Sequence, residues 1–469
     1  MKQFYPTNFT FTFRLLPLYR NTSLFLLIFL LNFTLGFGQD CTITSTASDL
    51  TDESPIPLDL NFEGAINRDL VADDFDITNG GIGSFQREVP EYLKGGQDKE
   101  LNNFLVSGSI GAIAGNPGSY IENAVISISQ LNESEVLFLT YGAGVKNLNL
   151  VTENIGSTAI NGNNLESPLD IEASLPGNNQ RFYLVDKDQQ QVNVYNSDVS
   201  AKLTDFKVPN YDSSNDVGPT GIVTDDDGNI YVAVAFTPDG SFDVEYDKIA
   251  VYTPGNYNNP TIFPPDNSGV ELDRPYRIAV DNTGKVYVAD SGGSTEYGRV
   301  LVFDENYNHI HTIEGSQDNI GAPGSIVIDD YGYVYIVDYQ QDITFTGIFQ
   351  NPLELLLNYS TIRDSNYAVN VYDSNSNFEY VTEFNQGLNL PIDLEVDFCG
   401  NILINNLELT GPAPLFSVNI NFNFQLKTFT RHDNFTAEVT PDEAGEVVVA
   451  LNSENDFFPC DPQPECSFS

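Results

Sequence analysis

One pattern recurs four times along the chain and constrains the fold more than any other feature. A proline is followed by a short run of alternating apolar residues, then by an Asp/Gly turn, then by a second alternating run. The copies begin at Pro219, Pro275, Pro323 and Pro391. Two alternating runs joined by a tight turn predict a β-hairpin. Because the hairpin repeats at a long period, the chain is predicted to be an array of similar units.

The spacing of the prolines predicts a β-propeller. The steps are 275 − 219 = 56 and 323 − 275 = 48 residues, and a looser copy at Pro168 lies 219 − 168 = 51 residues upstream. A period near fifty is typical of a four-stranded propeller blade. One more step back reaches Pro117, where three further alternating runs follow. We therefore expect six blades between about Gly108 and Phe429.

One step is longer than the others. From Pro323 to Pro391 it is 391 − 323 = 68 residues, so the fifth blade is predicted to carry an insertion, most of it between Tyr339 and Asn366. Irregular segments on a regular scaffold are frequent binding sites. The face that carries this insertion is therefore the first place to look for function.

The repeats resemble those of the NHL family. The best match runs from Ile278 to Asp290, as Ile-Ala-Val-Asp-Asn-Thr-Gly-Lys-Val-Tyr-Val-Ala-Asp, and continues with Arg-Val-Leu-Val-Phe at Arg299–Phe303. The resemblance covers roughly residues 110 to 430. It implies a six-bladed propeller of the NHL type, assigned here to residues 108–429.

The two flanks resemble the halves of a bacterial Ig-like domain. The first half is indicated by Pro-Ile-Pro-Leu-Asp-Leu-Asn-Phe, ending at Phe62, and by Asp-Phe-Asp-Ile-Thr-Asn-Gly, ending at Gly80. The closing half runs from Phe435 to Val449. We expect an all-β protein in which a six-bladed propeller interrupts a small Ig-like sandwich, with the sandwich at residues 41–86 and 430–458 and a Cys/Pro-rich tail at 459–469. The alternative is two unrelated β segments.

The N-terminus has the features of a cleaved signal peptide. Lys2, Arg14 and Arg20 precede an apolar run, Ser23–Leu35, and the small residues Gly36 and Gly38 follow. Residues 1–38 are therefore predicted to direct export, and the protein to be secreted or held at the cell surface without membrane insertion. A lipid anchor on Cys41 is disfavoured by Asp40 at a position that needs a small residue.

The charge excludes two classes of partner. The formal net charge is −46, and removal of the three basic residues of the leader gives −46 − 3 = −49. Such a surface repels nucleic acid and anionic lipid. Solubility in salt water is one explanation, and a population of Ca²⁺ sites is another. No cofactor is expected, and Ca²⁺ is the ion that the composition leaves open.

The four cysteines suggest a bond that closes the flanking domain. Cys41 opens the first flank and Cys460 follows the second, so a Cys41–Cys460 disulfide is the preferred pairing in an exported chain. Cys460–Cys466 is the competing pair, and Cys399 is expected to be unpaired. The three histidines are too few and too scattered for the usual imidazole-bound transition metal.

Several polar side chains are candidates for ligand binding because they lie where the second strand of a blade ends or approach the same face. They are Asp186, Arg274, Arg277, Asp290, Asp338 and Tyr339. One interpretation places them in a polar funnel at the mouth of the channel. The other is that each Asp caps its own loop through backbone N–H groups.

Function follows less directly than fold. The first hypothesis is a binding or scaffold protein that offers its loop face to a protein or glycan. The alternative is a Ca²⁺-dependent lactonase or hydrolase with its site in the propeller channel. No catalytic residue is named, and no repeat copy is expected to place a marked Glu in the channel, so a non-enzymatic role is favoured.

Overall fold

The computed structural model describes a large part of the chain. The described residues are 41–44, 55–63, 70–88, 106–112, 119–122, 125–132, 135–140, 144–150, 154–161, 165–174, 180–209, 217–236, 247–265, 268–291, 298–314, 320–339, 367–385, 387–397, 400–409, 419–429, 431–442, 446–451 and 464–467. They form strands, turns and two short 3-10 segments, η1 (Ala72–Asp74) and η5 (Ser374–Ser376). The protein is all-β, as expected.

The central part of the chain folds into sheets that follow one another in sequence. From the inner to the outer strand, the first blade contains β8 (Val125–Asn132), β9 (Glu135–Thr140), β10 (Gly144–Asn149) and β11 (Asn154–Asn161), and the second contains β12 (Pro168–Ala173), β13 (Arg181–Asp186), β14 (Gln191–Asn196) and β15 (Lys202–Lys207). The third blade contains β16 (Val217–Thr224), β17 (Ile230–Phe236), β18 (Lys248–Thr253) and β19 (Asn256–Phe263), and the fourth contains β20 (Pro275–Val280), β21 (Val286–Asp290), β22 (Arg299–Phe303) and β23 (His309–Ile313). The fifth blade contains β24 (Pro323–Ile328), β25 (Tyr333–Asp338), β26 (Ala368–Asp373) and β27 (Glu379–Phe384).

The sixth blade joins the two ends of this region. Its inner strands are β28 (Leu390–Val396), β29 (Ile402–Leu409) and β30 (Asn419–Phe429), and its fourth is β6 (Val106–Ala112), which precedes the first blade in sequence. β30 pairs with β6 in antiparallel register, and β7 (Ser119–Glu122) adds a fifth strand. The ring is therefore closed by hydrogen bonds between segments far apart in the sequence, a closure that the repeat pattern did not reveal.

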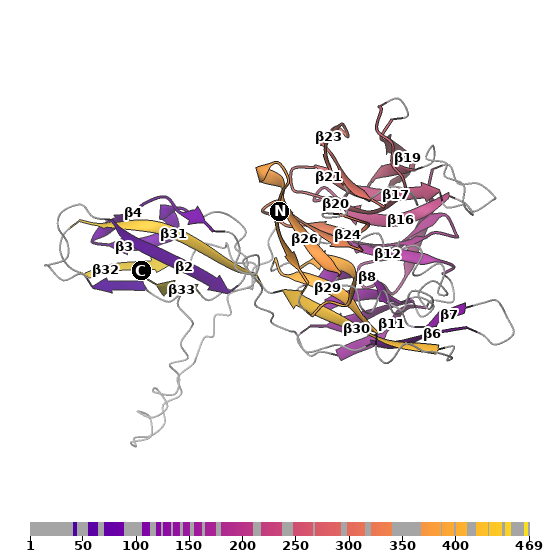
Figure 1. Cartoon of the computed structure of the whole chain (residues 1–469), viewed down its shortest axis with the longest axis horizontal. Helices are drawn as coiled ribbons and strands as arrows, with labels where there is room; N and C mark the ends of the chain where they lie inside the picture. The colour runs from indigo at the N-terminus through magenta and orange to yellow at the C-terminus, as the bar shows by residue number, and fades with distance from the viewer. Residues whose placement is uncertain are drawn as a thin grey trace, which may run out of the picture.

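The inner strands contact each other in a complete circle. β8 contacts β12, and the contacts continue through β16, β20, β24 and β28 back to β8. Six sheets arranged in this way form a six-bladed β-propeller (Figure 1). The predicted number of blades is confirmed. The predicted insertion of the fifth blade falls on residues 340–366, which lie outside the described residues.

The repeated Asp and Gly form the turn that makes each hairpin. In the fourth blade, Asp281 Oδ1 accepts hydrogen bonds from the backbone N–H groups of Thr283 and Lys285, both at 2.9 Å. Asp281 Oδ2 accepts one from the Tyr287 hydroxyl at 3.0 Å. Gly284 has φ 84°, a backbone conformation that residues other than glycine rarely adopt. One carboxylate thus fixes the turn and the start of the second strand.

This arrangement repeats in two neighbouring blades. The hydroxyls of Tyr231 and Tyr335 donate to Asp225 and Asp329, respectively, each six residues earlier in sequence. The hairpin interpretation of these Asp/Gly turns is confirmed. In the sixth blade Leu403 occupies the tyrosine position, and the turn keeps only its backbone and amide bonds.

The flanks pair with each other in two further sheets. One contains β1 (Cys41–Thr44), β32 (Glu446–Leu451) and β3 (Phe75–Thr78). The other contains β33 (Pro464–Ser467), β2 (Ile56–Glu63), β31 (His432–Pro441) and β4 (Gly80–Ile82), with β5 (Gln86–Arg87) also paired to β31. Strands from before and after the propeller alternate in both sheets. The hydrogen bonding expected between the flanks is therefore present.

The two flank sheets share one apolar core. Its buried members come from both sheets and are Leu58, Leu60, Phe62, Leu70, Phe75, Phe435, Val439, Val447 and Val449. The segment expected to be a tail contributes β33, which pairs with the edge of β2. Residues 464–467 therefore belong to this two-sheet unit, here called the sandwich, which lies to one side of the propeller (Figure 1).

Some sequence predictions fall on residues that the structure does not describe. The predicted signal peptide at 1–38 is among them, as are Cys399 and Cys460, so the Cys41–Cys460 pairing stays a prediction. Within the described ranges, no helix is long and apolar enough to cross a membrane.

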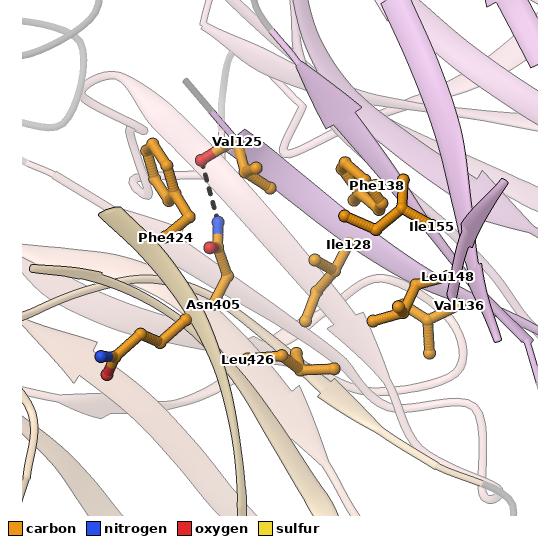
Figure 2. Close-up of a pocket in the computed structure, with 10 residues that line it drawn as sticks. Val125, Ile128, Val136, Phe138, Leu148, Ile155, Asn405, Phe424 and Leu426 are labelled. Atoms are coloured by element: carbon orange, nitrogen blue, oxygen red, sulfur yellow. Dashed lines mark hydrogen bonds between the residues drawn. The ribbon is translucent and has the colours of Figure 1, made fainter. Parts of the chain in front are cut away.

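A small apolar cavity marks the closure of the ring. It has a volume of about 30 Å³ and lies between the first and sixth blades (Figure 2). Its lining residues are Val125, Ile128, Val136, Phe138, Leu148, Ile155, Asn405, Phe424, Gln425 and Leu426. Asn405 Nδ2 donates to the Val125 carbonyl at 2.9 Å and ties the two blades together at this point.

The cavity predicts a stabilising substitution. Val136→Ile adds one methylene to a side chain that lines it, and is expected to stabilise the protein by roughly 0.5–1 kcal/mol because the added group fills empty space. The melting temperature measures the effect. Val286→Ile is the matched control, because Val286 occupies the same position in the fourth blade and is fully buried. Equal changes in the two variants would contradict this explanation.

Candidate functional site

The centre of the propeller contains a layer of six residues, one from each inner strand. They stand at equivalent positions, two residues after the blade proline where one is present, and are Ser127, Asp170, Gly221, Arg277, Ser325 and Asp393. A second layer, two residues further along, includes Glu172 and Glu395. Alternate residues of a strand point to the same face, so both layers line the channel.

Arg277 spans the channel from the fourth blade. Its Nη1 lies 2.8 Å from Asp170 Oδ2, and its Nε lies 3.4 Å from Asp393 Oδ1. The guanidinium also donates to three backbone carbonyls, those of Ile126, Leu169 and Thr220, at 3.2–3.3 Å. Arg277 is only 4% exposed. The Arg277 side chain therefore bonds to residues of the first, second, third and sixth blades, and it fills the middle of the channel.

A glycine lets the backbones of the third and fourth blades approach closely beside this guanidinium. Gly221 holds the same position in the third blade, and a Cβ there would lie 2.2 Å from the Tyr276 carbonyl oxygen. The Tyr276 ring lies beneath the Arg277 guanidinium, with 4.7 Å between Cζ and the ring centroid. Burial alone would lower the pKa of Arg277, but Asp170 and other neighbours raise it, so the group stays charged.

The two aspartates also join adjacent blades. Asp170 Oδ2 accepts a hydrogen bond from the Ile222 N–H, and Asp393 Oδ2 accepts one from the Ile128 N–H, both at 2.9 Å. The hydroxyls of Ser127 and Ser325 donate to the same carboxylates at 2.7 Å. These carboxylates are thus already bonded by backbone, hydroxyl and guanidinium groups.

Glu172 and Glu395 correct one expectation from the sequence, because they do place glutamates in the channel. Glu172 Oε1 accepts bonds from the Thr224 N–H and hydroxyl at 3.1 and 3.0 Å, and Glu395 Oε1 accepts one from the Gln130 N–H at 3.1 Å. Burial raises the pKa of Glu172 to about 8 and raises the pKa of Glu395 well above its usual range. The Glu172, Asp170 and Asp393 carboxyls add to the rise in the pKa of Glu395.

These carboxyls predict an unusual pH dependence. Because the folded protein holds Glu172 and Glu395 in their neutral forms, while the unfolded chain loses those protons above about pH 4.5, stability should fall as the pH rises from about 4.5 to 8. Glu172→Gln should remove part of this slope and stabilise the protein at pH 8 by on the order of 2 kcal/mol. Urea denaturation at pH 5 and pH 8 measures it.

A matched surface variant serves as the control for this titration. Glu305→Gln removes one carboxyl group from an exposed turn. It should leave the difference in the free energy of unfolding between pH 5 and pH 8 unchanged. A parallel loss of stability in wild type and Glu172→Gln from pH 5 to 8 would contradict the assignment.

The three aspartates that were predicted to bind a ligand are buried beneath the loops. Asp186, Asp290 and Asp338 are at most 5% exposed. Each accepts hydrogen bonds from backbone N–H groups just before its own blade, and the donors are Glu166, Ser167, Asp273, Gly321 and Ala322. The expected bonding to backbone N–H groups is therefore present, but the segment bonded is chiefly the one that enters the blade and not the loop that follows each aspartate. Burial raises the pKa of Asp290 to about 7, and Arg299 opposes this rise.

The other three candidates have separate surroundings. Arg277 lies in the channel. The Arg274 N–H donates to Asp247 Oδ2 at 2.7 Å, with φ 63° at Arg274. The fully buried Tyr339 donates its hydroxyl to the Pro391 carbonyl at 2.9 Å and fits against Gly324, where a Cβ would lie 2.4 Å from its ring. The structure thus brings Arg277 to the channel and distributes the others beneath the loops.

The channel carboxyls had a signal in the sequence. Pro-Leu-Asp-Ile-Glu at Pro168–Glu172 and Pro-Ile-Asp-Leu-Glu at Pro391–Glu395 are the same motif in two copies. Its acidic residues alternate, so they had to share one face of the inner strand. Among the described residues, no group of three or more His, Cys, Asp or Glu side chains is arranged to hold a metal ion.

Comparisons with known proteins give no family. No family model matches the chain, and no curated protein matches it. Solved structures that resemble it include the nidogen/laminin complex, at 15% identity over 60% of this chain and 94% of that one with a TM-score of 0.40. A gluconolactonase from Xanthomonas campestris resembles it at 11% identity over 72% and 100%, with a TM-score of 0.43. A virginiamycin B lyase from Staphylococcus aureus does so at 11% over 71% and 99%, with a TM-score of 0.40.

Proposed function

We propose that the chain is a secreted or cell-surface binding protein, built from an NHL-type propeller inserted in a bacterial Ig-like sandwich. Its partner is a protein or glycan, bound on the face where the second strands of the blades end and where Asp186, Asp290 and Asp338 lie. This face is called the loop face below. The opposite face, which carries the Asp/Gly turns, is called the hairpin face.

The observation that carries this proposal is the position of Arg277. A Ca²⁺-dependent hydrolase needs free carboxylates converging on the cation in the channel. Here the centre of the channel holds a guanidinium paired with Asp170 and Asp393. A second cation at this point would be repelled, and the aspartate oxygens already have donors. The channel is built to stabilise the ring, which favours binding on the outer faces.

The framework beneath the loop face supports the same conclusion. Buried aspartates hold the ends of the strands through backbone N–H groups. Loops held at their bases by a rigid scaffold are suited to recognition. The strongly acidic composition favours a neutral or basic partner surface.

Two measurements test the proposal. Titration of the exported protein with Ca²⁺ in a calorimeter should give no heat attributable to a channel site, whereas glycan arrays and cell-surface protein panels should yield a saturable partner. Lactonase activity that depends on Ca²⁺ and disappears in Glu172→Gln would overturn the proposal and favour the hydrolase.

A further inference from the structure

One turn on the hairpin face differs from its counterparts. In the fifth blade, Tyr331 lies two residues after the turn aspartate, Asp329. The third and fourth blades have Asp227 and Thr283 at the equivalent position. A large aromatic ring is therefore added to this turn alone among these three, at the side of the propeller where the chain leaves for the sandwich.

Two arginines from the sandwich side meet this turn. Arg431 follows the last propeller strand directly and is 1% exposed. Its Nη1 lies 2.9 Å from Asp329 Oδ2, and its Nε lies 2.7 Å from Asp433 Oδ1. Arg87, in β5, reaches the other oxygen of Asp433 at 2.8 Å. Two arginines and two aspartates thus form one chain of ion pairs between the modules.

The same arginines stack on aromatic rings. The Cζ atoms of Arg87 and Arg431 lie 3.7 and 3.9 Å from the centroid of the Tyr331 ring. Arg87 also lies 4.5 Å from the centroid of Phe435, which belongs to the sandwich core. Planar guanidinium groups held both by carboxylates and by rings have little freedom to reorient.

The cluster is balanced in charge and largely buried. Asp329 and Asp433 are 4% and 0% exposed. The Asp329 carboxylate also accepts the Tyr335 hydroxyl, and Asn401 Oδ1 of the sixth blade accepts the Arg431 N–H at 2.9 Å. Separating one partner from such a network leaves a buried charge uncompensated. A different orientation of the two modules would separate these pairs, so it is strongly disfavoured.

We propose that this junction cluster, formed by Arg87, Asp329, Tyr331, Arg431, Asp433 and Phe435, locks the sandwich in a single orientation against the hairpin face at the fifth and sixth blades. The propeller and sandwich then move as one rigid body, and the loop face points away from the sandwich. Modules in one chain otherwise reorient by default unless their interface is large or strongly bonded.

Distances between spin labels test the proposal in the full-length protein. The labels are carried by a ketone-bearing amino acid in place of the exposed Val71 and Tyr380, so that the cysteines are not modified. One narrow distance distribution is expected. Tyr331→Thr, which installs the residue of the fourth blade, should make the distribution roughly twice as wide or more, because the aromatic platform for both guanidinium groups is lost.

Two further variants make the result decisive. Asp227→Thr changes the matching position of the third blade and should leave the distribution narrow. Arg87→Met removes a contact from the sandwich side and should broaden the distribution as Tyr331→Thr does, with circular dichroism confirming that each variant is folded. A broad distribution in the unaltered protein, or a narrow one in both junction variants, would overturn the proposal.

Discussion

Replacing Arg277 with methionine is expected to destabilise the protein by about 3–5 kcal/mol at pH 7. The substitution keeps much of the side-chain volume but removes the charge that compensates Asp170 and Asp393. Three backbone carbonyls lose their donors at the same time. The loss should be smaller at pH 5, because burial raises the pKa of Asp170 to about 7 and its protonated form needs no cation.

Urea denaturation followed by tyrosine fluorescence measures this effect. Adding Asp170→Asn and Asp393→Asn to Arg277→Met should recover part of the lost stability, since removing a whole buried ion cluster costs less than removing one partner. Lys202→Ala is the control, because Lys202 and Asp205 form an exposed pair whose loss should cost less than about 1 kcal/mol. A cost for Arg277→Met as small as that of the control would refute the central role of Arg277.

Deleting residues 430–469 is expected to unfold the N-terminal flank completely while the propeller stays closed. β1 and β3 both pair with β32, and β2 lies between β31 and β33. β4 and β5 pair with β31. None of these five N-terminal strands pairs with another, so the deletion removes every sheet neighbour that they have in the described structure.

Hydrogen exchange provides the measurement. In the truncated protein the amides of β2 and β3 should exchange as in an unfolded chain, whereas those of β21 and β25 should keep their protection because β6 and β30 remain paired. The propeller strands of the truncated protein serve as the internal control. Protection of residues 56–78 in the truncated protein would show that the N-terminal flank folds alone.

The repeat made the propeller predictable because each copy contains its own local instructions. Asp281, Gly284 and Tyr287 act within one hairpin, and the third and fifth blades repeat their spacing. Four copies and a looser fifth, at steps of 48 to 68 residues, then leave few architectures to consider. The pairing of the flanks was predictable for a similar reason, since alternating runs such as Leu58–Phe62 need a partner to cover one face.

The channel was harder to predict because its contacts cross the ring. Arg277 of the fourth blade meets Asp170 of the second and Asp393 of the sixth only once all three blades are placed around one axis. Arg277 and Asp290 were both candidates for the same binding face, yet one fills the channel and the other bonds to the segment that enters its blade. The similar motifs that begin at Pro168 and Pro391 were the available clue, and they become informative only when both are assigned to inner strands.

The junction and the closing strand lacked even such a clue. Tyr331 looks like any turn residue until Arg87 and Arg431 are placed beside it. β6 has no repeat motif, because as an outer strand it is held by its pairing with β30 and not by its own turn. Contacts between distant segments that share no pattern are therefore what the sequence conceals.

The alternation of early and late strands in the sandwich imposes an order on biosynthesis. Ile56 pairs with Val439, a separation of 439 − 56 = 383 residues. At typical rates of elongation, the partner of β2 is synthesised roughly 20–80 s after β2 itself. During this interval Leu58, Leu60 and Phe62 have no sheet to cover them. A chain of this design must keep its first strands from aggregating until its last strands have been synthesised.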